Sequence, residues 1–169
     1  HPPHLPPPDP LPATTDLLVI GAGVIGTSTA MFAAGAGIET VVIDRAAPNS
    51  QASGGNAGSL HVQLLSWDFG RKAMAGGSPA LNTIPLQRDA VQLWKQLERE
   101  LGGDFEITTT GGLMVAENEE QTAFLRDKAE AERSMGIPAE VITRDEIFAL
   151  APHIAERMVV AAYCPDEGK

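Results

Sequence analysis

Residues 21–26, near the start of the chain, have the composition and spacing of a phosphate-binding turn. They read G-A-G-V-I-G, which matches the pattern G-x-G-x-x-G. In such a pattern Gly21 permits a tight turn, Gly23 lets a pyrophosphate approach the backbone, and Gly26 lets a helix pack close to the preceding strand. Asp44 follows about 20 residues later, where its carboxylate can accept hydrogen bonds from an adenosine ribose. These residues together predict a dinucleotide site.

The segments around this turn predict the elements that such a site requires. Residues 17–20 are a short apolar run, as expected of a buried parallel strand. Residues 24–34 are small and apolar and predict a buried helix, whose N-terminus would offer N–H groups and a partial positive charge to phosphates. Residues 40–43 predict a second buried strand that ends at Asp44. The order strand, helix, strand is a βαβ unit, so we expect an α/β fold of the Rossmann-like type.

The same region has a second interpretation, because residues 17–38 carry no charge and are long enough to span a bilayer. Glycines interrupt this stretch, and no Lys or Arg flanks it closely. A strand and a helix joined by a tight turn explain the same hydropathy, so we expect no transmembrane segment. The residues before it lack the basic start of a secretory signal, which favours a cytoplasmic protein, free or peripheral to the membrane through partners.

A loop of small residues follows the second predicted strand. Residues 50–59 read S-Q-A-S-G-G-N-A-G-S. Such a loop exposes backbone N–H groups and adds Ser and Asn donors, which suit a pyrophosphate and the polar edge of a flat ring. A flexible surface linker is the alternative interpretation. The glycine pattern itself does not choose between NAD and FAD, although Asp44 disfavours NADP because it would repel a 2′-phosphate, an argument that the neighbouring Arg45 weakens.

Composition excludes several classes of function. The chain has 169 residues and a net charge of -10, from 22 acidic and 12 basic side chains, which argues against a general nucleic-acid binder. The single cysteine, Cys164, excludes an internal disulfide framework and a Cys-rich zinc site, and no spacing of ligand residues suggests another metal. We expect Cys164 to be structural and His61 to be a loop histidine without a catalytic role. Residues 1–15 are rich in proline and predict a disordered leader.

The second half of the chain alternates amphipathic helices with short strands. Residues 45–83 are predicted to be mainly loop, and residues 86–101 a helix with Ala90, Leu93, Trp94, Leu97 and Leu101 on its apolar face. Further predicted elements are a hairpin of residues 105–109 and 113–116 around Gly111 and Gly112, a helix to about Met135 capped by Asn118 with Gln121 completing a capping box, a strand at 141–142, a helix opened by a capping box of Thr143 and Glu146, and a strand over 158–163.

Several of these segments resemble one family of flavoproteins. D-L-L-V-I-G-A-G-V-I-G-T-S-T-A (16–30), V-V-I-D-R (41–45), S-G-G-N-A-G (53–58), T-G-G-L-M-V-A (110–116) and Y-C-P-D-E-G-K (163–169) are similar to the FAD-dependent D-amino acid oxidase (DAO) superfamily. The chain is most similar to the flavoprotein subunits of opine oxidase, hydrogen cyanide synthase and D-hydroxyproline dehydrogenase. The resemblance covers residues 16–169.

The resemblance implies FAD as the cofactor and oxidation of a C–N bond as the reaction. The substrate would be a small amine or amino acid, whose α-carbon gives a hydride to flavin N5 and leaves an imine that water hydrolyses. The three glycines would hold the pyrophosphate, Asp44 the ribose, Arg45 would lie beside the adenosine, and the loop would reach the pyrophosphate and flavin. The cofactor-binding residues that we predict are Gly21, Gly23, Val24, Ile25, Gly26, Asp44, Arg45, Ser53, Asn56, Ala57 and Gly58.

The resemblance also implies the domain organisation. Residues 16–86 would be the FAD-binding Rossmann-like portion, and residues 87–169 helices and the start of an α+β substrate domain. Family members are more than twice as long, and their substrate-facing residues come later, so we expect an N-terminal fragment that is inactive alone and leave the catalytic residues unassigned. An NAD-dependent dehydrogenase and a non-catalytic nucleotide-binding subunit of a hetero-oligomer remain the alternatives.

Overall fold

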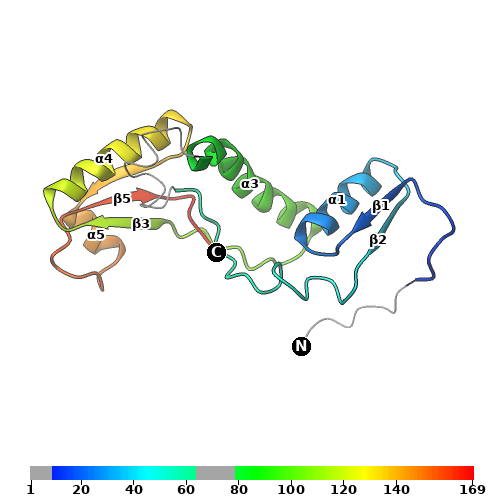
Figure 1. Ribbon diagram of the computed structural model, residues 1–169. Helices are drawn as coiled ribbons and strands as arrows, with labels where there is room; N and C mark the ends of the chain where they lie inside the picture. Colours follow the sequence, from blue (N-terminus) through cyan, green and yellow to red (C-terminus); the bar gives the residue numbers. More distant parts are fainter. Residues whose placement is uncertain (1–8, 64–78) are drawn as a thin grey trace. The chain divides into compact units, whose positions relative to one another are not determined.

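The computed structural model describes residues 9–63 and 79–169. Residues 1–8 of the predicted leader lie outside the described part. The chain divides into two compact units, which we call the first unit (residues 1–57) and the second unit (residues 58–169). Figure 1 labels most of the helices and strands of each.

The first unit contains a parallel pair of strands joined by a helix. Strand β1 (Leu17–Ile20) pairs with β2 (Thr40–Ile43), with Leu17 opposite Thr40. Helix α1 (Val24–Gly35) connects the strands and packs on them. The predicted βαβ unit is therefore confirmed, and with it the α/β fold class.

The sheet of the first unit is covered on one face only. Leu18, Ile20 and Val42 are 50%, 79% and 36% exposed, and helix α1 has no buried residue. Among the described residues of this unit, Ala22 alone belongs to the buried apolar set. The helix was predicted to be buried, and this is wrong for the described residues because a single helix on two strands leaves its own outer face open.

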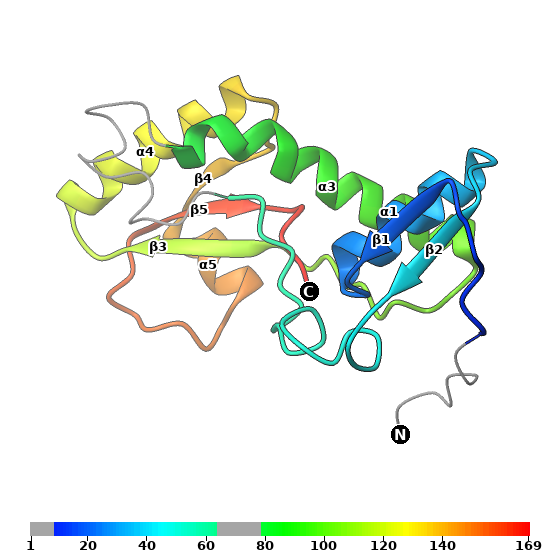
Figure 2. The ribbon, with the colours of Figure 1, turned by 45° about the vertical axis from the view of Figure 1, so that its right-hand side comes forward.

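The second unit is built around an antiparallel sheet. Its strands are β3 (Gly112–Ala116), β4 (Glu140–Thr143) and β5 (Val160–Cys164), in the order β3-β5-β4. Figure 2 shows β5 between its two neighbours. Strands β4 and β5 correspond to the strands predicted at 141–142 and 158–163.

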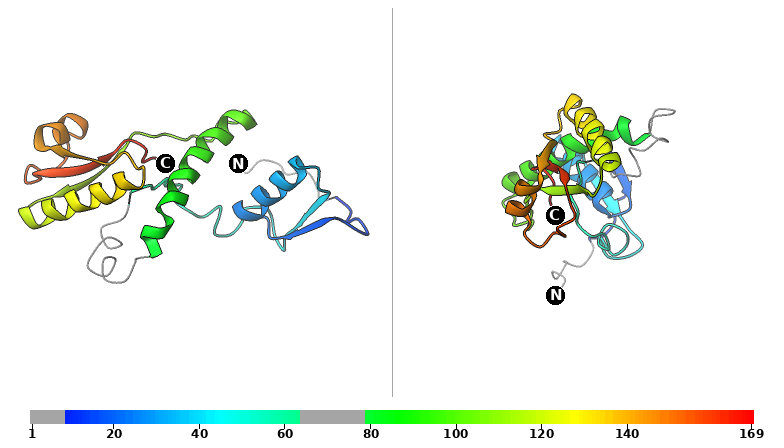
Figure 3. Two further views of the ribbon diagram at one scale, coloured as in Figure 1. Left: turned by 90° about the horizontal axis from the view of Figure 1, so that it is seen from above. Right: turned by 90° about the vertical axis from the view of Figure 1, so that its left-hand side faces the viewer.

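Two helices cover opposite faces of this sheet, as seen from above in Figure 3. Helix α4 (Glu119–Ser134) contributes Leu125 to a cluster with Ala162 of β5. Helix α5 (Arg144–Leu150) contributes Ile147 to a cluster with the next β5 residue, Ala161. Successive residues of a strand point to opposite faces, so small side chains along β5 let a helix approach from both sides.

The long helix α3 (Pro79–Leu101) differs from its prediction in both start and orientation. It begins before residue 86, and its buried side chains include Val91 and Leu97, whereas Leu93 and Leu101 are 41% and 56% exposed. Val91 packs in one cluster with Ala129 of α4, so contacts with α4 set which face is buried. The predicted apolar face is therefore confirmed at Leu97 and wrong at Leu93 and Leu101.

The predicted hairpin of residues 105–109 and 113–116 is wrong. Residues 105–109 form no strand in the structure, and β3 pairs with β5 instead. Thr108 exchanges two backbone hydrogen bonds with Lys169, at 2.8 and 3.0 Å, and the N–H of Gly111 donates to the carbonyl of Glu167. The C-terminal segment thus occupies the place that a hairpin partner would take.

The two predicted capping boxes have different outcomes. The Thr143 side chain accepts from the Glu146 N–H while Glu146 accepts from the Thr143 N–H, so the box at α5 is confirmed. At α4 the Asn118 side chain accepts from the Gln121 N–H at 2.9 Å, as predicted. The return bond is shifted by one residue, because Gln121 Oε1 accepts from the N–H of Glu117.

Candidate functional site

The turn between β1 and α1 has the conformation that its glycines predict. Gly21 has a φ of +108°, in the region that favours glycine, and its N–H donates to the Ile43 carbonyl at 2.8 Å. A Cβ on Gly26 would lie 1.8 Å from the Gly21 carbonyl oxygen and 3.3 Å from Val19 Cγ1. Helix α1 therefore lies so close to the turn and to β1 that only glycine fits at position 26.

The N-terminus of α1 has no side-chain cap from its own N-cap residue and instead forms a hydrogen bond with Ser53. Gly23 is the N-cap residue and has no side chain to cap the helix. The Val24 N–H donates to Ser53 Oγ at 3.0 Å, and a Cβ on Gly23 would lie 2.9 Å from that same oxygen. Two predicted segments, the glycine turn and the small-residue loop, thus meet at one helix end.

Asp44 connects the end of β2 to the glycine turn. Its Oδ2 accepts from the Ala22 N–H at 2.7 Å, and its Oδ1 accepts from the Ala46 N–H at 2.9 Å. These bonds, the one from Ala22 first, hold the pKa of the Asp44 carboxyl below its usual value because they favour the charged form. Each carboxylate oxygen can accept more than one hydrogen bond, so Asp44 retains acceptors for another partner.

The loop after β2 is folded onto the turn rather than extended away from it. The Asn49 N–H donates to the Ala22 carbonyl at 3.0 Å, and the Asn56 side chain donates to the Ser53 carbonyl. Backbone bonds from Gly54 and Gly55 to Gln51 close turns within the loop. Part of the predicted loop 45–83 lies outside the described residues.

The predicted cofactor residues have different places in the structure. Six of them gather around the start of α1 in the first unit: Gly21, Gly23, Val24, Gly26, Asp44 and Ser53. The Ile25 side chain is 82% exposed, and Arg45 is also exposed. Ala57 belongs to the first unit and Gly58 to the second, so the structure does not place these two in one site.

This arrangement fits a dinucleotide. Gly23 has no side chain between its backbone and the Ser53 hydroxyl, the N–H groups of a helix start are close by, and an ionised carboxylate lies at the end of the next strand. The fit depends on the absence of a side chain at position 23, since a methyl group there would lie 2.9 Å from the Ser53 hydroxyl oxygen.

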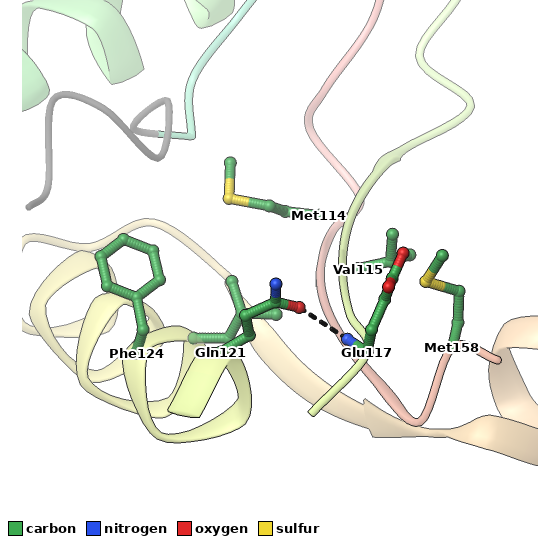
Figure 4. Close-up of a pocket in the computed structure, with 7 residues that line it drawn as sticks. Met114, Val115, Glu117, Gln121, Phe124 and Met158 are labelled. Atoms are coloured by element: carbon green, nitrogen blue, oxygen red, sulfur yellow. Dashed lines mark hydrogen bonds between the residues drawn. The ribbon is translucent and has the colours of Figure 1, made fainter. Parts of the chain in front are cut away.

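A separate hollow of about 280 Å³ lies in the second unit, beside β3 and α4 (Figure 4). It is lined by Met114, Val115, Glu117, Gln121, Phe124, Leu125 and Met158. Its two polar side chains already have partners: Gln121 accepts from the Glu117 N–H, and the Glu117 carboxylate pairs with Arg157 at 2.8 Å. It therefore offers no group poised for acid or base chemistry.

Other candidate groups in the described ranges 9–63 and 79–169 add no metal or thiol chemistry. No cluster of His, Cys, Asp and Glu side chains there could hold a metal ion. Cys164 is buried, and burial raises the pKa of its thiol to about 11, which fits the predicted structural role. Over the same ranges, no helix is both long and apolar enough to cross a membrane.

A family model described as FAD dependent oxidoreductase (DAO) matches residues 16–169. The chain belongs to the DAO family. FAD is the cofactor of this family, which favours FAD over the NAD alternative left open by the glycine pattern. The relatives of the chain are therefore FAD-dependent oxidoreductases.

Three DAO relatives show the extent of the likeness. The anaerobic glycerol-3-phosphate dehydrogenase subunit A1 of Haloferax volcanii is 29% identical over 150 residues, which are 89% of this chain and 23% of that protein. The monomeric sarcosine oxidase of a Bacillus species is 25% identical over 139 residues, 82% of this chain and 32% of that protein. The structure of glycine oxidase from Geobacillus kaustophilus has a TM-score of 0.72 at 25% identity and covers 92% of this chain and 40% of that one. The chain thus spans a third or less of the curated relatives' length.

Proposed function

We propose that this chain forms the adenosine and pyrophosphate part of the FAD site in an oxidoreductase that oxidises the C–N bond of an amino acid or secondary amine. The observation that carries the proposal is the meeting of the Gly23 backbone, the start of α1 and the Asp44 carboxylate in the first unit. When bound, FAD supplies the hydride acceptor. The domain organisation stays part of this proposal, with residues 16–86 on the cofactor side and 87–169 beginning the substrate domain.

The predicted residues around the start of α1 have roles that their positions support. The N–H groups of Ile25 and Gly26 would hold the pyrophosphate, together with the Ser53 hydroxyl and the Val24 N–H that donates to it. The carboxylate of Asp44, held by the Ala22 N–H, would accept from the ribose hydroxyls.

Four further residues complete the proposed site. Arg45 would lie beside the adenosine, since it follows Asp44 directly. Asn56, Ala57 and Gly58 continue the loop toward the pyrophosphate and the flavin.

A second candidate function is oxidation of a C–O bond in a phosphorylated alcohol. The similarity to a glycerol-3-phosphate dehydrogenase subunit at 29% identity favours it. Both reactions pass a hydride to the same cofactor and differ only in the substrate groups that must be held. That relative is named as a subunit, which supports partner subunits for this protein too. We infer that the protein works in the cytoplasm, either free or held at the membrane through such partners.

The test uses the full-length protein, purified and reconstituted with FAD. We expect flavin absorbance, and its bleaching under anaerobic conditions by one member of a panel of glycine, sarcosine, proline and D- and L-amino acids. Bleaching by glycerol 3-phosphate alone would favour the second candidate. Protein that binds NAD and no FAD would contradict the proposal in favour of the NAD-dependent dehydrogenase. Protein that binds FAD but is bleached by neither substrate class would contradict it in favour of the non-catalytic subunit.

A matched pair of variants links the test to the described turn. Gly23→Ala places a methyl group where the pyrophosphate would approach, and its nearest neighbour is the end of a movable side chain, Ser53. We expect folded protein with at least tenfold weaker FAD binding, since a good phosphate contact is charge-assisted. Gly35→Ala, at the other end of α1 with no atom within 4 Å of the new Cβ, is the control and should bind FAD normally.

A further inference from the structure

The backbone of Ala22, in the middle of the glycine turn, is held from two sides by the segment that follows β2. Its N–H donates to Asp44 Oδ2 at 2.7 Å, and its carbonyl accepts from the Asn49 N–H at 3.0 Å. Ala22 is only 5% exposed. The Ala22 N–H therefore belongs to the phosphate-binding turn by its position, but its partner is a carboxylate of the chain itself.

Asn49 reaches Ala22 with an unusual backbone conformation. Its φ is +58°, in the left-handed region that asparagine adopts more readily than most residues with a side chain. The loop closes tightly behind it, because a Cβ on Gly54 would overlap with the Asn49 carbonyl oxygen. Position 49 thus combines a conformation that few side chains tolerate with a hydrogen bond to the glycine turn.

The Asp44 carboxylate joins three points of the first unit. It follows the last residue of β2, its Oδ2 accepts from Ala22 in the turn, and its Oδ1 accepts from Ala46 in the next loop at 2.9 Å. The neighbouring backbone bond from Gly21 to the Ile43 carbonyl, 2.8 Å long, ties the turn to β2 a second time. The hydrogen bonds to Asp44 lower the pKa of its carboxyl, so both of its oxygens remain acceptors at neutral pH.

A contact with the ribose does not by itself explain this arrangement. An acceptor that served only ribose hydroxyls would need no bond to the turn, yet each oxygen of Asp44 already faces an N–H group of the chain. A turn that is ordered before its ligand arrives loses little conformational entropy on binding. The bonds from Asp44 and Asn49 to Ala22 provide such order.

We propose that Asp44 and Asn49 are positioning residues of the phosphate-binding turn, which they hold in the shape that fits a pyrophosphate whether or not a ribose is bound. This inference rests on the proposed function and gives Asp44 a second role besides its contact with the ribose. Both residues act through Ala22. The apoprotein should therefore bind inorganic pyrophosphate, FAD should displace it, and its affinity should depend on both positions.

Inorganic pyrophosphate separates the two roles of Asp44 because it carries no ribose. In calorimetric titration of the full-length apoprotein, Asp44→Asn should raise the dissociation constant for pyrophosphate about fivefold, the value of one ordinary hydrogen bond at a carboxylate that solvent reaches. The single amide oxygen cannot replace both carboxylate oxygens. A contact with the ribose alone predicts no loss or a gain, since removal of a negative charge near the turn favours an anion. Asp16→Asn, on an exposed residue before β1, is the matched control for charge.

A second pair of variants tests Asn49 without any change of charge. Asn49→Gly and Asn49→Val both keep the N–H that donates to Ala22, but only glycine adopts a φ of +58° without strain. Asn49→Val should raise the dissociation constant for pyrophosphate by roughly fivefold to thirtyfold. Asn49→Gly should stay within about twofold of the wild type. This pair suffices if Asp44→Asn does not fold.

The outcomes are distinct. Pyrophosphate affinity in Asp44→Asn that equals or exceeds that of the wild type, together with weaker FAD binding, would overturn the positioning role of Asp44 and leave its contact with the ribose intact. Equal affinities in Asn49→Gly and Asn49→Val would overturn the role of Asn49. Wild-type apoprotein that binds FAD but no pyrophosphate would overturn the preformed turn. Failure to bind either ligand would instead refute the proposed function.

Discussion

The tightest contact of the proposed cofactor site lies at Gly26, and its removal gives a quantitative prediction. In Gly26→Ala the new Cβ would stand 1.8 Å from the Gly21 carbonyl oxygen, whereas ordinary contact begins at 3.4 Å. The neighbour is backbone on one side and Val19 on the other, so no flexible side chain can give way. The start of α1 must then move by about 1.6 Å, the difference between those two distances.

Such a shift should be costly for FAD binding. Overpacking by one methyl group typically costs about 1–3 kcal/mol, and a loss of that size in binding would lower the affinity by a factor of roughly 5 to 150. The helix N-terminus that would meet the pyrophosphate moves with the backbone, so we expect the dissociation constant for FAD to rise by at least about fivefold. Titration of the full-length apoprotein with FAD, followed by quenching of flavin fluorescence, measures it.

Gly35→Ala is the matched comparison, since it adds the same methyl group to the same helix in open space. It should leave the affinity for FAD unchanged. If Gly26→Ala binds FAD as tightly as the wild type, the inference that α1 packs on the turn to place its N–H groups is wrong.

Three further predictions concern the second unit in the full-length protein. Thr143→Ala should lower the free energy of unfolding, measured by urea denaturation, by about 1 kcal/mol, the usual value of an N-cap. The N–H and hydroxyl of Thr143 lower the pKa of Glu146. The part of the cap due to that carboxylate should therefore be present above the ordinary pKa of 4.5 and be lost as the pH falls through the lowered pKa. Cys164 should resist iodoacetamide at pH 8 in the native protein and react after unfolding, since the pKa of its buried thiol is raised to about 11; fast labelling of native protein would contradict this. Lys128→Met leaves the buried Glu132 without its ammonium, 2.6 Å away, and should cost about 3–5 kcal/mol, with recovery in the double variant Lys128→Met/Glu132→Leu; an equal loss in both variants would show that the pair is not coupled.

The elements of the first unit could be predicted because their signals are local. Each strand is a short apolar run, and Gly21 and Asp44 mark where β1 and β2 end. The exposure of Ile20 could not be predicted, since it depends on how many other elements cover the sheet. Periodicity says that a side chain is apolar but not what lies against it.

In the second unit, the contacts that could not be predicted join residues that lie far apart in the sequence. The segment before β3 looked like its hairpin partner, yet Thr108 pairs with Lys169, and β3 pairs with β5. In the same way, the contact between His61 and Glu167 joins residues 106 positions apart and leaves no mark in either neighbourhood. Ser53 was predicted to lie near the phosphates, whereas its hydrogen bond from the Val24 N–H depends on how the loop folds back onto α1 and could not be predicted from the sequence.

The position of Glu167 also sets a time scale for biosynthesis. Its carboxylate accepts a hydrogen bond from the N–H of Val62, a residue made 105 positions earlier. At about 5–20 residues per second, the ribosome adds such a length in roughly 5–20 s. During that interval the Val62 N–H has been translated but lacks the carboxylate that fixes it, so the two ends of the second unit can close on each other only after nearly all of this chain has been made.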